Sequence, residues 1–280
     1  MEHLARRAIM TIRENYHEPL ALDDLARSVM MSKFYFLRVF QRTTGVTPGR
    51  FLSAVRIQEA KCLLVHTHAN VADISARVGY SSPSTFSRRF TDSVGLSPTQ
   101  YRKISRGECE EFPRITPLPV ATGPLGSISG TAHLTGTPLS PLYVGVFDSP
   151  ILQGQPVAWT RPDGAGAFSL ENVPPGTWYL HAVTLGTRAS GDQCCGSPLL
   201  VGATGPVEIG AGTPTCLDIA VRQEDWSRPP VLLALPGLGR KPSRLPPAEG
   251  AARPPGPAAP EAGYRAPRRP TATVSRLVGV

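Results

Sequence analysis

The decisive stretch of this 280-residue sequence reads Gly79-Tyr80-Ser81-Ser82-Pro83-Ser84-Thr85-Phe86-Ser87-Arg88-Arg89-Phe90, and Gly95, Pro98 and Tyr101 follow it. The pattern occurs once before, where Phe36, Arg38, Phe40, Gly45, Pro48 and Phe51 match Phe86, Arg88, Phe90, Gly95, Pro98 and Tyr101 at an offset of 50. Ahead of these residues, Asp24-Leu25 matches Asp73-Ile74 at an offset of 49. A fixed offset indicates a duplicated structural unit. The smaller offset predicts one extra residue in the turn of the second unit.

Residues 1–106 show the apolar periodicity of amphipathic helices, with short polar breaks between them. The helices expected in the first unit are Leu4 to Tyr16, Leu22 to Val29 and Lys33 to Arg42, with Ser32 as N-cap of the third and Gly45 as its end. A helix, a tight turn and a second helix that begins with small polar residues form a helix-turn-helix. The repeat therefore predicts two helix-turn-helix units.

A further helix, from Gly49 to His66, is expected to connect the two units, because Pro48 is acceptable in its first turn. Eighteen residues give a helix of roughly 27 Å at 1.5 Å rise per residue. Successive major-groove faces on one side of DNA lie about 34 Å apart. A rigid connection of this size would let a single chain place two recognition helices about one DNA turn apart.

The motif from Gly79 to Phe90, with Gly95-Leu96-Ser97-Pro98 and Tyr101-Arg102 after it, resembles the signature of the AraC/XylS family of bacterial transcription regulators. The resemblance covers about residues 3–104 and includes both units in order. It implies a sequence-specific regulator without a cofactor, whose partners are double-stranded promoter or operator DNA and RNA polymerase. The family usually carries a cupin-like sensor barrel ahead of its DNA-binding domain. Because the helical pattern begins at residue 3, no such barrel is expected here.

In that family the third and sixth helices enter the major groove, which assigns DNA contacts to matching positions of this chain. The assigned residues are Ser32, Lys33, Phe34, Leu37, Arg38 and Arg42 in the first unit, and Ser82, Ser84, Thr85, Ser87, Arg88 and Arg89 in the second. Arg38 and Arg88 can each bind O6 and N7 of a guanine, and the hydroxyl groups of the second unit can donate or accept. Phe34 and Leu37 can touch only thymine methyl groups or sugars.

The remaining polar and aromatic residues of the repeat have other expected roles. Contacts to phosphates, or plain solvation, are expected for Lys33, Arg42, Arg50, Arg56, Arg89, Arg102 and Lys103. The repeated phenylalanines, Phe36, Phe40, Phe86 and Phe90, are expected in the core, and Pro83 is expected only to start its helix. The pair His66 and His68 has no obvious third ligand, so no metal site is expected.

The periodicity changes to that of β-strands after the prolines between residues 113 and 124. The expected strands are Gly126 to Leu134, Leu142 to Phe147, Val157 to Thr160, Ala167 to Leu170, Trp178 to Leu185, Val207 to Ile209 and Leu217 to Val221. About seven short strands suggest an antiparallel sandwich. The run from Asp163 to Leu180 resembles the carboxypeptidase-regulatory-like family, a transthyretin-like sandwich. Such domains are usually passive modules.

The fold class expected for the whole chain is therefore multidomain. Its parts are a tandem helix-turn-helix domain over residues 1–106, a linker over 107–124, an all-β sandwich over 125–222 and a disordered Pro/Ala/Arg-rich tail over 223–280. No enzymatic activity is expected, because the chain lacks His-Glu-x-x-His, Gly-x-Ser-x-Gly and Walker-type motifs.

An alternative function is that of a sensor whose β domain is gated by a ligand, a metal or oxidation and controls DNA binding. The vicinal thiols Cys194 and Cys195, with Cys216 downstream, could bind a soft metal or respond to oxidants, although inert thiols are the simpler interpretation. A third alternative is an interaction protein with a vestigial DNA-binding domain. The effector, if there is one, stays unassigned.

Charge is distributed unevenly along the chain, whose net charge is +8. Residues 1–106 hold 16 basic and 8 acidic residues, residues 107–222 hold 4 and 9, and residues 223–280 hold 9 and 4. The cationic first segment suits DNA, and the acidic second segment does not. With no apolar run of roughly 20 residues and no signal-peptide pattern, the chain is expected to be cytoplasmic and without a membrane partner.

Overall fold

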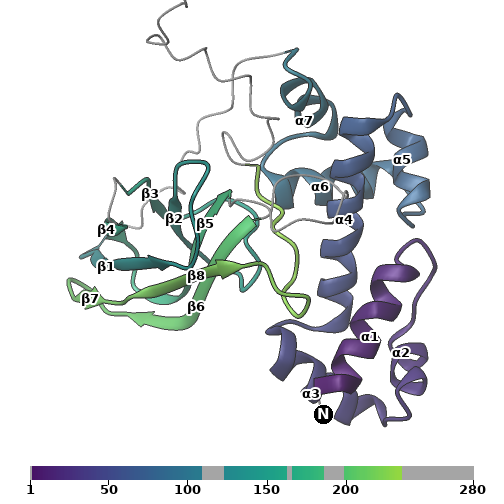
Figure 1. Ribbon diagram of the computed structural model, residues 1–280, viewed down its shortest axis with the longest axis horizontal. Coiled ribbons are helices and arrows are strands. Elements are labelled where there is room, and N and C mark those ends of the chain that lie inside the picture. Colours follow the sequence, from purple (N-terminus) through teal and green to yellow (C-terminus); the bar gives the residue numbers. More distant parts are fainter. Residues whose placement is uncertain (1, 109–122, 163–165, 186–198, 235–280) are drawn as a thin grey trace, which may run out of the picture. The chain divides into compact units, whose positions relative to one another are not determined.

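The helices of the N-terminal part follow the repeat found in the sequence (Figure 1). The computed structural model describes residues 2–108, 123–162, 166–185 and 199–234. The helices are α1 (Glu2–Glu14), α2 (Leu22–Ser28), α3 (Lys33–Thr44), α4 (Pro48–His66), α5 (Val71–Arg77), α6 (Pro83–Val94) and α7 (Pro98–Ser105). The two predicted helix-turn-helix units and the connecting helix are confirmed, and the turn before α6 is one residue longer than the turn before α3. None of these helices is both long and apolar enough to cross a membrane.

The ends of the helices repeat as well. Gly45 and Gly95 follow α3 and α6 in the left-handed conformation, with φ of 76° and 81°, which glycine adopts without a steric penalty. Ser82 is the N-cap of α6, where its side chain accepts a hydrogen bond from the backbone N–H of Thr85. Ser32 occupies the N-cap position of α3 as predicted, but its side chain makes no capping hydrogen bond.

The core of the helical domain (residues 2–108) is built from the same aromatic positions in both units. Phe36 and Phe40 are buried, with ring centroids 5.6 Å apart, and Phe86 and Phe90 repeat this arrangement at 5.6 Å. Each pair is extended by an aromatic ring from the next helix, Phe51 on α4 and Tyr101 on α7. The core assignment of the repeated phenylalanines is confirmed.

The β domain (residues 126–223) forms one curled sheet of eight strands (Figure 1). The strands are β1 (Gly126–Leu134), β2 (Tyr143–Phe147), β3 (Ala158–Thr160), β4 (Ala167–Val173), β5 (Gly176–Leu185), β6 (Leu199–Ile209), β7 (Pro214–Cys216) and β8 (Ile219–Gln223). They are hydrogen-bonded in the order β3-β2-β5-β6-β8-β1-β4, and β7 pairs with β1. The strands at the two ends of this order, β3 and β4, contact each other, which nearly closes the sheet.

This topology differs from the expected antiparallel sandwich in two respects. All eight strands belong to one sheet, and β1 pairs in parallel with both β7 and β8. The sequence pattern could not show this, because alternation within a strand reports which face is buried and not which strand is its neighbour. All seven expected strands are present; β1 has the expected ends, the other six have shifted ends, and β7 was not expected.

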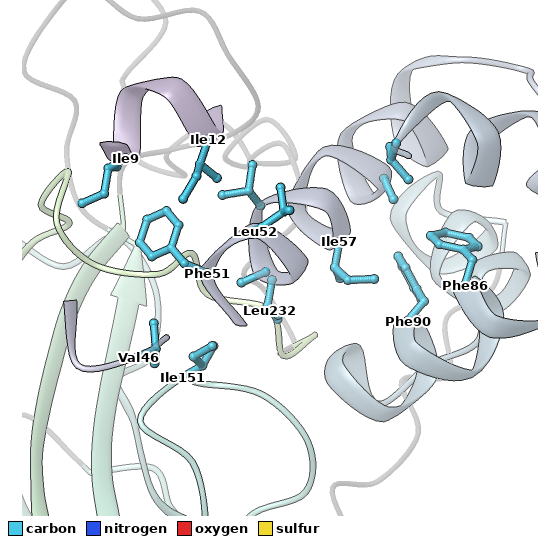
Figure 2. Packing of buried hydrophobic residues seen from close by; sticks show 14 of the residues in the cluster. Ile9, Ile12, Val46, Phe51, Leu52, Ile57, Phe86, Phe90, Ile151 and Leu232 are labelled. Atoms are coloured by element: carbon cyan, nitrogen blue, oxygen red, sulfur yellow. The ribbon is translucent and has the colours of Figure 1, made fainter. Parts of the chain in front are cut away.

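The sequence predicts that a disordered tail begins at residue 223, and this starting point is wrong, because the structure describes residues up to 234. After β8 the chain continues through residues 226–234, where Leu232 is buried within the core of the helical domain. Figure 2 shows the side chains of Leu232 and Ile151 among those of the helical core. The rest of the predicted tail, from residue 235, and most of the predicted linker lie outside the described residues.

Candidate nucleic-acid interface

The exposed faces of α3 and α6 lie opposite their buried aromatic residues and carry the side chains predicted to contact DNA. In the first unit Ser32, Lys33, Phe34, Arg38 and Arg42 are exposed, whereas Leu37 is half-buried. In the second unit Ser84, Thr85, Arg88 and Arg89 are exposed, whereas Ser82 and Ser87 are half-buried. Each helix therefore presents a continuous polar or mixed face whose position is fixed by the core beneath it.

The two faces differ in chemistry at matched positions. Phe34, in the first turn of α3, is 81% exposed. Its counterpart in α6 is Ser84, whose hydroxyl lies 2.8 Å from that of Ser82. Met30, in the turn before α3, adds an apolar side chain that is 88% exposed. The first unit is suited to apolar contact and the second to hydrogen bonding.

Two side chains of the first unit are held by neighbours. Arg38 has its guanidinium carbon 5.7 Å from the centre of the Tyr35 ring, a cation–π geometry. Lys33 forms an exposed ion pair of 3.2 Å with Asp23 of α2. Tyr35 was not among the predicted site residues, although it lies 50 positions before Thr85, which was. The repeat itself is the signal that could have identified it.

Three arginines that were predicted as phosphate contacts or solvated charges instead bind atoms of the chain. Arg56 donates to the backbone carbonyls of Tyr16 and Glu18. Arg102 donates to the carbonyls of Leu64 and Ala69 near the end of α4. Arg56 and Arg102 bind these groups for the same reason: carbonyl groups at helix ends and in connections lack backbone partners and attract nearby cations.

The third of these arginines, Arg50, donates from Nη2 to the hydroxyl of Ser149 at 3.0 Å. Arg106, which had no predicted role, donates to the carbonyl of Thr67 at 2.6 Å. Together with Arg102 it satisfies carbonyl groups around the end of α4. The cationic charge of the helical domain is thus partly structural, and Arg38, Arg42, Arg88 and Arg89 remain exposed on α3 and α6.

The alternative function, a gated sensor, depends on three cysteines, and the structure describes only one of them. Cys216 is free and exposed at the end of β7, while Cys194 and Cys195 lie outside the described residues. Cys62 on α4 is disulfide-bonded. In the part of the chain that the structure describes, no group of three or more His, Cys, Asp or Glu residues could hold a metal ion.

A small hollow with a cavity volume of about 20 Å³ lies against β2 and β5 of the β domain. Its lining is predominantly apolar and aromatic, and consists of Tyr143, Val144, Gly145, Phe147, Leu152, Pro156, Trp159, His181, Val183 and Leu233. His181 is buried, and this burial lowers its pKa to about 4. Its Nε2 donates to the carbonyl of Ser149 at 2.9 Å, so the ring is neutral and fixed.

Comparison with known proteins finds similarity in the helical domain. A helix-turn-helix domain family matches residues 25–104. The melibiose operon regulatory protein of Escherichia coli (strain K12) is 36% identical over 102 residues, which are 36% of this chain and 34% of that protein. The chain therefore spans about a third of the length of that relative. A solved structure of the DNA-binding domain of AdpA in complex with a target DNA is 28% identical, with a TM-score of 0.36, and covers 39% of this chain and 97% of that one.

A shorter relative shares most of its length with this chain. The transposon Tn10 TetD protein of Escherichia coli is 31% identical over 102 residues, which are 36% of this chain and 74% of that protein. The matched helix-turn-helix family covers residues 25–104, which include α3 and α6. The chain belongs to the AraC/XylS family of helix-turn-helix transcription regulators.

Proposed function

We propose that this protein is a sequence-specific transcription regulator that binds promoter DNA through α3 and α6 in successive major grooves. The observation that carries this proposal is that α3 and α6 match: each helix has one exposed face, and each is fixed to the core by two buried phenylalanines on its opposite face. The two faces are joined by α4, whose 19 residues give a length of about 28 Å. This length is compatible with two recognition helices about one DNA turn apart.

The predicted contacts are assigned by the chemistry of each exposed side chain. Arg38 and Arg88 bind guanines, and Ser84, Thr85 and Ser87 form adaptable hydrogen bonds to bases. Phe34 and Leu37 contact thymine methyl groups or sugars. Contacts to phosphates come from Ser32, Lys33, Arg42, Ser82 and Arg89. RNA polymerase is the proposed protein partner, and the cytoplasm is the proposed location, because a promoter-binding regulator acts where the chromosome is.

The domain division proposed for this chain places the helical domain before a β domain of the carboxypeptidase-regulatory-like type. In support, β4 and β5 are joined by Pro174 and Pro175, and Phe168 of β4 is buried in the core of the β domain. The glycine that follows, Gly176, has φ of 146° and begins β5. These features give the motif a structural role, and no catalytic role is proposed for it.

A second candidate function is a ligand-gated regulator, and the hollow beside β2 and β5 favours it. Small-molecule sites are mostly apolar with few polar groups, as the lining of this hollow is, and they measure about 300–1,000 Å³. The cavity volume here is about 20 Å³, so a small aromatic molecule would enter only if the surrounding side chains moved apart. Exposed Trp159 at its edge would report such binding by its fluorescence. The corresponding test titrates small aromatic compounds against Trp159 fluorescence and against DNA affinity in parallel. Binding that leaves DNA affinity unchanged would remove this candidate.

Selection of bound DNA from a random pool, with the full chain at physiological salt, tests the main proposal. The expected result is an enriched sequence with two half-sites whose centres are about 10 base pairs apart. Arg38→Ala and Arg88→Ala should each relax the preference in a different half-site at a cost of about 1–3 kcal/mol. Arg27→Ala, on the exposed surface of α2, serves as the control and should change neither half-site. Uniform weak binding to all sequences would contradict the proposal.

A further inference from the structure

The segment after the β domain is built into the core of the helical domain. Leu232 is 1% exposed and belongs to the hydrophobic cluster that contains Phe51 and Phe90. Figure 2 shows the Leu232 side chain among the residues of α4. Trp226 packs against the same cluster, and the guanidinium of Arg6 lies 5.5 Å from the centre of its ring. We call residues 226–234 the strap.

A half-buried lysine on the connecting helix anchors the strap. Lys61 of α4 donates from Nζ to the carbonyl oxygens of Val231 and Leu232, each at 3.1 Å. Its ammonium group also lies 5.7 Å from the centre of the Tyr101 ring. A buried ammonium group is costly unless its donors are used, and here the strap supplies two acceptors. The strap and α4 therefore satisfy each other's polar groups.

The strap also reaches the end of the second recognition helix. The backbone N–H of Ala234 donates to the carbonyl of Val94, the last residue of α6, at 2.9 Å. Next to it the N–H of Gly154, in the loop after β2, donates to the carbonyl of Ser93 at 3.0 Å. The last carbonyl groups of a helix have no partners within it, so these two bonds fill positions that water would otherwise take.

The first recognition helix has no corresponding support. The carbonyls at matched positions of α3 belong to Thr43 and Thr44, and neither accepts such a backbone hydrogen bond from another element within the described residues. The loop after β2 is in turn tied to the strap, since the N–H groups of Leu232 and Leu233 both donate to the carbonyl of Leu152. The support is thus specific to the second unit and connects it to the β domain.

We propose that the strap is a positioning element for DNA reading by the second helix-turn-helix unit. The strap fixes the C-terminal end of α6 relative to α4. Because the strap follows directly from the β domain, the β domain controls this placement. The contacts leave Ser84, at the opposite end of α6, and Arg88, in its middle, exposed. The strap therefore acts by orienting α6 and not by covering its DNA-facing residues. This inference rests on the proposed DNA-binding function.

The experiment combines amide hydrogen exchange with DNA binding in full-length variants. Leu232→Ala removes the buried anchor, and Lys61→Met keeps the apolar stem while removing the two hydrogen bonds to the strap. Leu170→Ala is the matched control, because Leu170 is buried in the core of the β domain alone. Two DNA probes are compared for each variant: the selected site, and the same site with the half-site read by α6 scrambled.

The expected result is faster exchange over residues 226–234 and 90–97 in both strap variants and not in the control. Affinity for the complete site should fall about tenfold, while affinity for the scrambled site stays unchanged. Exchange that accelerates without any effect on DNA binding would overturn the positioning role. Equal weakening on both probes would also overturn it, since that indicates a general loss of folding. If the unaltered chain selects no DNA site, the proposed function is wrong. If amide exchange at residues 90–97 is unchanged in the strap variants, the strap does not stabilise the end of α6, whatever the DNA result.

Discussion

The Nε atom of Arg56, on the connecting helix, donates a hydrogen bond of 2.7 Å to the backbone carbonyl of Tyr16, at the start of the α1–α2 connection. Its Nη2 donates to the carbonyl of Glu18 at 2.8 Å, and the guanidinium lies 5.7 Å from the centre of the Tyr80 ring. Tyr16 belongs to the first unit and Tyr80 to the turn of the second. One side chain therefore joins both helix-turn-helix units to α4.

Replacing Arg56 should destabilise the helical domain. Arg56→Ala leaves the part-buried carbonyl of Tyr16 without its partner, and a hydrogen bond to a charged group is worth about 1.5–3 kcal/mol. We expect a loss of about 2 kcal/mol in the free energy of unfolding, measured by urea denaturation. Arg27→Ala removes an exposed ion pair with Asp24 and an exposed hydrogen bond to the carbonyl of Asp23, and it should cost about 0.5 kcal/mol or less. A loss for Arg56→Ala as small as that of Arg27→Ala would contradict the joining role.

Gly79, in the turn between α5 and α6, allows the close approach of the two units. A Cβ atom there would lie 2.7 Å from the carbonyl oxygen of His17 and 2.9 Å from Nη2 of Arg56, and φ is 86°. Gly79→Ala should therefore cost the left-handed penalty of about 1–2 kcal/mol and a further steric term. Gly45→Ala is the matched control, with φ of 76° and open space around its Cβ. Thermal unfolding should give a larger loss for Gly79→Ala, and equal losses would refute the close contact.

Ser75 offers a stabilising substitution. It is fully buried on α5, and its hydroxyl has no hydrogen-bond partner within the described residues. The matched position of the first unit is Ala26, also buried, so the fold accommodates alanine there. Ser75→Ala should raise the free energy of unfolding by about 1 kcal/mol, because it removes an unsatisfied polar group. Chemical denaturation measures the change, and a clear loss of stability would show that the hydroxyl is paired.

His181 should make the β domain sensitive to acid. Burial lowers its pKa to about 4 from an ordinary value of 6.5. The hydrogen bond to Ser149 acts in the opposite direction and raises the pKa, whereas the positive charge of Arg228 lowers it further. Between pH 6.5 and 4 the unfolded chain binds a proton that the folded chain does not. This contribution to stability is therefore complete above pH 6.5 and falls through that window by at most about 3 kcal/mol.

The acid effect can be followed by the fluorescence of Trp159 and Trp178 during urea denaturation at pH 7 and pH 5. His181→Gln keeps a donor for Ser149 and removes the titration, so the difference between the two pH values should shrink. An undiminished pH effect in His181→Gln would show that another group causes it.

The exposed ring of Phe34 predicts a dependence on thymine methyl groups. In the selected DNA site, replacing thymine by uracil at the contacted step removes the C5 methyl and should weaken binding by about 0.8 kcal/mol. Phe34→Ser, which copies the residue of the second unit, should abolish this difference without a change in stability, because Phe34 is 81% exposed. Binding assays on matched thymine and uracil duplexes measure it. The same replacement opposite Ser84 should have no such effect in the unaltered chain.

The sequence alone determined the helical domain in most of its detail. Repeated Phe, Gly and Pro positions set the helix boundaries and buried faces, because helix periodicity and helix ends are local properties of the chain. For the same reason the repeat was sufficient to assign the exposed faces at Arg38 and Arg88. In the β domain the strands were predicted and their pairing was not, since β1 meets β7 and β8 only through contacts distant in sequence.

Only the tertiary structure decided which charges are structural and where the helical core is completed. Arg56 and Lys61 look like solvent-exposed cations in the sequence, yet each binds backbone carbonyls. Those acceptors lie about 40 and 170 residues away along the chain. Leu232 follows a proline-rich stretch that predicted disorder, and it is buried because α4 offers an apolar surface and a donor for its carbonyl. Such partners are brought together by the fold, so no local pattern in the sequence could identify them.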